Sequence, residues 1–132
     1  MRSRHAVLLL ALVCSGCMLG TGAGNFRPAN GPAGITVAFD LVQGAPLTGE
    51  LLEVRDTALL VLAGSKVWLV RFTATKSASF RQRGELDFSR GFPPTPRQLI
   101  AMRRVARFPT GLTPELRQKL LQVYGQTAES LP

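Results

Sequence analysis

The chain has 132 residues, which suits one domain, and its 16 basic and 8 acidic residues give a formal net charge of +8. Its only histidine, His5, and its two cysteines, Cys14 and Cys17, all lie within the first 17 residues. The rest of the chain therefore excludes cysteine and histidine nucleophiles, a thiolate metal site and a disulfide framework. Carboxylates, lysines and hydroxyl groups remain, and we expect no metal and no cofactor.

The first 16 residues are arranged as a signal peptide. Arg2 and Arg4 precede the apolar run AVLLLALV from Ala6 to Val13, and small residues follow it. This run would form about 12 Å of helix, against about 30 Å for the hydrocarbon core of a bilayer, so it is not a spanning anchor. The cysteine pair CSGC that follows has no second cysteine or histidine pair for zinc and no βαβ setting for redox chemistry.

The order Ser15, Gly16, Cys17 resembles the lipobox of bacterial lipoprotein signal peptides. In that family the cysteine becomes the first residue of the mature chain and is acylated. The resemblance implies a signal peptide at residues 1–16 and acyl chains such as palmitate on Cys17, with membrane lipid as the partner. Because Met18 is not an aspartate, it also implies an exported protein anchored in the outer membrane of the cell envelope and facing the periplasm.

One position departs from that family, since Cys14 stands where leucine is usual. The alternative is ordinary signal cleavage after Ala23, which would discard Cys17. Loss of Arg2 and Arg4 from the 16 basic residues leaves 14 against 8 acidic residues, so the mature chain is basic in either case. A basic face could meet anionic lipid headgroups, or the charge could serve solubility alone.

Residues 17–34 are rich in glycine, proline and asparagine and predict a flexible tether. From residue 35 the pattern becomes that of strands, and residues 35–82 predict a small β domain. Ile35, Val37, Phe39 and Leu41 alternate with polar or small residues. A second strand follows in LTGELLEVR; ALLVLA and KVWLVRF form a hairpin around Gly64-Ser65, and TKSASF is a weaker fifth strand ending at Phe80.

The third and fourth of these segments are apolar on both faces, so both faces of the sheet need a cover. The sheet either curls into a partial barrel or receives the helices that follow it. Trp68 is interpreted as a core residue, with a ligand platform as the alternative.

The segment VAFDLVQGAPLTGELLEVRDTALLVLAGSKVWLVRF resembles the strand pattern of Sm-like and SH3-like small barrels, within residues 35–80. The resemblance implies a curled sheet. The RNA-binding asparagine of the Sm-like family is missing, because Asp56 leads to Leu59 and Leu60, and its second signature is missing because Arg71 is followed by Phe72. We therefore expect the shape without nucleic-acid binding.

Residues 83–95 predict a loop, and residues 96–125 predict a hairpin of two amphipathic helices. Thr95 with Pro96, and Thr113 with Pro114, are typical helix starts. Basic residues share the outer face of the first helix and are candidates for an anionic-surface contact: Arg97, Arg103, Arg104 and Arg107. Residues 126–132 predict a disordered tail. The expected fold class is α+β, with a strongly curled antiparallel sheet or partial barrel of about five strands followed by a two-helix hairpin.

The function that this pattern favours is a non-enzymatic, membrane-anchored envelope lipoprotein with a small binding or assembly domain. The first alternative is a secreted hydrolase that uses Glu50, Glu53 or Asp56 as acid and base. Glu50 and Glu53 are an odd number of residues apart on one strand, which predicts opposite faces and argues against a paired site. The second alternative is an Sm-like nucleic-acid binder, which the export signal disfavours.

Overall fold

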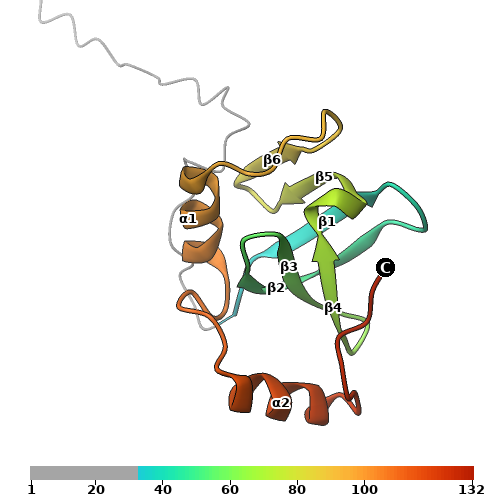
Figure 1. Ribbon diagram of the computed structural model, residues 1–132, viewed down its shortest axis with the longest axis vertical. Helices are drawn as coiled ribbons and strands as arrows, with labels where there is room; N and C mark the ends of the chain where they lie inside the picture. The colour runs from blue at the N-terminus through green and yellow to red at the C-terminus, as the bar shows by residue number, and fades with distance from the viewer. Residues whose placement is uncertain (1–32) are drawn as a thin grey trace, which may run out of the picture.

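The computed structural model describes residues 33–132 (Figure 1). The predicted signal peptide, Cys17 and nearly all of the predicted tether lie outside the described residues. The strands are β1 (Thr36–Leu41), β2 (Leu47–Val54), β3 (Ala58–Ala63), β4 (Lys66–Arg71), β5 (Thr75–Phe80) and β6 (Gly84–Asp87). A short 3₁₀ helix, η2 (Phe72–Ala74), joins β4 to β5, and the helices α1 (Pro96–Val105) and α2 (Pro114–Val123) follow.

The strands form one antiparallel sheet in the order β4-β3-β2-β1-β5-β6, which is not closed into a barrel. The predicted α+β class is confirmed. The sheet gains a sixth strand, because β6 lies inside the segment predicted as a loop and pairs with β5 from Phe80↔Gly84 to Ser77↔Asp87. Only Leu86 of this four-residue strand is buried. The segment therefore lacks the alternation of apolar and polar residues by which a strand is predicted.

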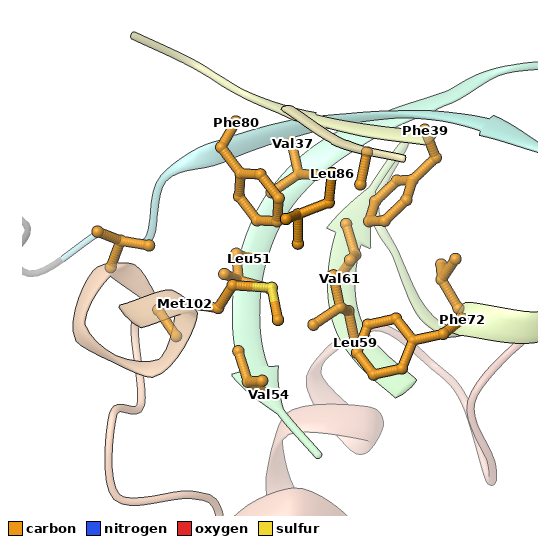
Figure 2. Packing of buried hydrophobic residues seen from close by; sticks show 14 of the residues in the cluster. Val37, Phe39, Leu51, Val54, Leu59, Val61, Phe72, Phe80, Leu86 and Met102 are labelled. Atoms are coloured by element: carbon orange, nitrogen blue, oxygen red, sulfur yellow. The ribbon is translucent and has the colours of Figure 1, made fainter. Parts of the chain in front are cut away.

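The larger hydrophobic cluster lies on one face of the sheet and is covered by α1. Val37, Phe39, Leu51 and Phe80 supply its sheet side, and Met102 reaches toward them from α1 (Figure 2). Trp68 packs against this cluster and donates from Nε1 to the carbonyl of Ala63 at 3.1 Å.

The smaller cluster lies on the other face and is covered by α2. Its buried members are Leu52, Leu60, Val67 and Leu121. α1 and α2 thus contact different clusters on different sides of the sheet (Figure 1), and the predicted helical hairpin is corrected. The cause is the doubly apolar sequence of β3 and β4, because each face needs its own cover.

The connection between the helices crosses from one face to the other beside β2. Arg107 and Phe108 donate backbone hydrogen bonds to the carbonyls of Leu51 (3.0 Å) and Leu52 (2.9 Å). α1 therefore ends at Val105, with Ala106 already extended at φ −77° and ψ 153°. Both predicted starts are confirmed, since the hydroxyls of Thr95 and Thr113 accept the backbone N–H groups of Gln98 and Leu116.

The C-terminal segment, predicted as a disordered tail, instead runs along the outer edge of β4 (Figure 1). Ser130 donates to the carbonyl of Val67 and accepts from the N–H of Leu69, both at 2.9 Å. The side-chain amide of Gln126 accepts from the N–H of Val67 at 2.7 Å and donates to its carbonyl at 3.1 Å. Backbone groups of an edge strand need partners, and this segment supplies them.

Candidate functional site

The three carboxylates of the hydrolase hypothesis lie on or just after β2. Leu52 is an extra residue in this strand, because the pairing shifts from Leu51↔Val61 to Glu53↔Leu60. This β-bulge puts Glu50 and Glu53 on the same face, opposite Leu62 and Leu60, which corrects the expectation of opposite faces.

Each of these carboxylates is nevertheless held by an arginine. Glu50 accepts from Nε of Arg107 at 2.7 Å, and Asp56 accepts from Arg103 at 2.9 Å. Glu53 accepts from Arg55 at 3.3 Å and from the backbone N–H of Leu112. These bonds join the segments that follow α1 and β2 to the sheet, and they occupy carboxylate oxygens that a hydrolase would need free for substrate or water.

A second ion-pair network joins α2 to the C-terminal segment. Arg117 donates from Nε and Nη2 to the two carboxylate oxygens of Glu129, and Nη2 of Arg55 lies 3.4 Å from the same carboxylate. The hydrogen bonds from Arg117 lower the pKa of Glu129 to about 2, against the opposing effect of burial. The same bonds raise the pKa of Arg117. The Glu129 side chain is only 7% exposed, and its ion pair with Arg117 attaches the C-terminal segment to α2.

The four arginines predicted as one basic stripe fall into two groups. Arg103 is bound to Asp56 and to the carbonyl of Val54 at 3.3 Å. Arg107 lies beyond the end of α1, against Glu50. Arg97 and Arg104 are exposed and make no ion pair with any described residue. The stripe is not continuous because Asp56 and Glu50, which are distant in sequence, lie beside Arg103 and Arg107 in the fold and pair with them.

An apolar hollow lies beside the loop between β6 and α1, near the C-terminal end of β1. Phe72 and Phe88 stack at its wall with ring centroids 5.3 Å apart. Phe92 is 71% exposed and Val42 is 51% exposed at its rim. The hollow has a volume of about 730 Å³.

A more polar hollow of about 870 Å³ adjoins it and is lined by Asp40, Glu85 and Asp87 among others. The Ser89 side chain, and then its backbone N–H, donate to Asp87 and lower the pKa of that carboxyl. Sequence reasoning missed both hollows. Their only signal was the GFPP segment at residues 91–94, which was interpreted as part of a loop.

Over residues 33–132, no group of three or more acidic side chains is arranged to hold a metal ion. In the same range no buried side-chain nitrogen or oxygen lacks a hydrogen-bond partner. None of the helices in the described part of the chain is both long and apolar enough to cross a bilayer. No known protein family, no curated protein and no solved structure matches this chain.

Proposed function

We propose that this protein is a non-enzymatic lipoprotein of the cell envelope, anchored through Cys17 and carrying a small binding or assembly domain. The observation that carries the proposal is the order of the first 17 residues: two arginines, a short apolar run, then Ser-Gly-Cys. A diacylglyceryl thioether supplies more than one acyl chain, and stable anchoring needs more than one. The domain faces the periplasm from the outer membrane.

The contacts within the domain support a non-catalytic role. Arginines hold all three carboxylates that a hydrolase would have used, and the cluster around Glu129 fastens the C-terminal segment to α2 and β2. These ion pairs join α1 and the segment after it to β2 and the residues that follow it, and they join α2 to the C-terminal segment, which is a structural role.

Lipid attachment is tested by labelling cells with a palmitate analogue while they express the full chain. The wild-type chain should carry the label and sediment with membranes, and Cys17→Ala should lose the label. The variant should then be released into the soluble envelope fraction or remain as an uncleaved precursor. Cys14→Ala is the matched control and should keep the label, because its position is removed with the signal peptide.

The mass of the purified protein separates the two processing routes. A chain that begins at an acylated Cys17 supports the proposal. A chain that begins at Gly24, with label and membrane retention unaffected by Cys17→Ala, would overturn it in favour of ordinary secretion.

A further inference from the structure

The described chain enters the domain at a fixed point at one end of the sheet. The N–H of Gly34 donates to Glu50 at 2.7 Å, and the N–H of Ile35 donates to the carbonyl of Val105 at 2.9 Å. A Cβ at residue 34 would lie 1.9 Å from the carbonyl oxygen of Leu51, so only glycine fits. Any tether that precedes these residues therefore leaves the domain from this end.

Three arginines that make no ion pair with any described residue have backbone positions near this point. Arg81 directly follows β5, and its N–H donates to the carbonyl of Thr36 at 3.0 Å. Arg83 lies two residues on, in the β5–β6 turn, and Arg104 precedes the Val105 carbonyl that binds Ile35. We name these three residues the tether-side patch: Arg81, Arg83 and Arg104.

Two of the acids near this end are paired with arginines, and a third, Glu85, is exposed on β6 two residues after Arg83. Glu50 is paired with Arg107, and Asp56 with Arg103. Arg81 and Arg104 are exposed, and Arg83 is half-buried. The end of the domain where the chain enters thus presents three arginines against one acid, Glu85, that is unpaired among the described residues, and it keeps a net positive charge. Arg97 lies at the opposite end of α1.

We infer that the tether-side patch docks the domain on a bilayer that contains anionic phospholipid headgroups, an inference that rests on the proposed anchoring at Cys17. Residues 18–33 reach at most about 55 Å when fully extended, so the lipid alone would leave the orientation of the domain free. A basic patch beside the tether fixes that orientation, because anionic surfaces attract basic residues within about one Debye length. The apolar hollow at Phe92 then points away from the bilayer.

The test uses the mature chain, residues 17–132, with Cys17→Ala so that no acyl chain contributes. Its co-sedimentation is measured with vesicles of phosphatidylglycerol and phosphatidylcholine, and with phosphatidylcholine alone, at low and at physiological salt. The chain should bind the anionic vesicles only, and binding should weaken as salt rises. Since each basic residue near the surface contributes about fivefold, Arg81→Gln/Arg83→Gln/Arg104→Gln should weaken binding at least about tenfold.

The matched control removes the same charge elsewhere, at three exposed residues that make no ion pair within residues 33–132: Lys66→Gln/Arg90→Gln/Lys119→Gln. It should change binding by no more than about threefold, because these residues lie away from the contact. Should the first triple variant fail to fold, Arg81→Gln/Arg104→Gln against Lys66→Gln/Lys119→Gln makes the same comparison at exposed sites only.

Equal losses in the two variants would overturn the inference, because binding would then follow net charge alone. Absence of binding to anionic vesicles at low salt would also overturn it, as would tighter binding to a single-stranded oligonucleotide that the first variant abolishes. The palmitate experiment in cells is independent, since the vesicle assay uses a chain without lipid. Each proposal can therefore fail without the other.

Discussion

The two edges of the sheet are protected in different ways. At β4 the C-terminal segment pairs with the backbone of Val67 and Leu69, and Glu129 fastens that segment to Arg117. At the other edge β6 has only four residues, and Glu85 and Asp87 are exposed on it. A long apolar edge needs a cover, whereas a short acidic edge repels a second copy of itself. The sequences differ accordingly, KVWLVR in β4 and GELD in β6.

Gln126 explains how a non-strand segment can cover the β4 edge. Its side-chain amide places an N–H donor beside a carbonyl acceptor, and it bonds to both backbone groups of Val67 as a paired strand would. Ser130 then continues the pairing through its own backbone as an isolated parallel bridge with Trp68. The cover depends on two residues and one ion pair rather than on a seventh strand.

Removal of the cover should have the largest effect. A chain that ends at Gly125 loses the bonds of Gln126 and Ser130 and the Glu129 ion pair, at a cost of at least about 3 kcal/mol in the free energy of unfolding. It should also self-associate through the bare β4 edge. Urea unfolding measures the first effect, and light scattering of the folded protein measures the second.

A chain that ends at Ser130 is the control for this truncation. It loses only Leu131 and Pro132, which are exposed, and its stability should lie within about 0.5 kcal/mol of the full chain. Equal stability of the two truncated chains would show that the segment does not protect the edge.

The ion pair alone should account for a smaller part of this difference. Glu129→Gln should cost about 2 kcal/mol at neutral pH, because it leaves Arg117 without its partner. The folded pKa of about 2 lies below the unfolded value, so the stabilisation is complete above about pH 4.5 and is lost as the pH falls toward 2. Urea unfolding should therefore show a shallower loss of stability over this range in the variant.

Glu115→Gln is the control for this pH dependence, because Glu115 is an exposed residue of α2 and makes no ion pair with any residue from 33 to 132. Its stability should follow that of the wild type from neutral pH to acid. An acid unfolding curve of Glu129→Gln that coincides with both would contradict the assignment.

The first five strands and both helix starts could be predicted from sequence because each depends on local signals. Alternation from Ile35 to Leu41 and the Thr-Pro pairs at residues 95 and 113 need no knowledge of the rest of the chain. The cover of β4 could not be predicted in the same way. Nothing local in Gln126 or Glu129 indicates partners about 60 and 12 residues away, at Val67 and Arg117.

The predictions of how the two helices pack and of how the candidate site residues are oriented were wrong for a related reason. Amphipathic periodicity in residues 96–125 shows that each helix has an apolar face but not which face of the sheet it covers. The bulge at Leu52 reversed the expected orientation of Glu50 relative to Glu53, and a bulge leaves little trace in a single sequence. The division of the arginine stripe likewise depended on Asp56 and Glu50, which only the fold brings near.

The smallest effect is expected beside the open β6 edge, at Phe92. This side chain is 71% exposed at the rim of the apolar hollow, so Phe92→Ser should change the free energy of unfolding by less than about 0.5 kcal/mol. Phe88→Ala is the matched comparison, because Phe88 is only 7% exposed and stacks on Phe72, and it should cost about 3 kcal/mol. Both are measured by urea unfolding. A large loss in Phe92→Ser would contradict this expectation and would mean that the Phe92 side chain packs as part of the core.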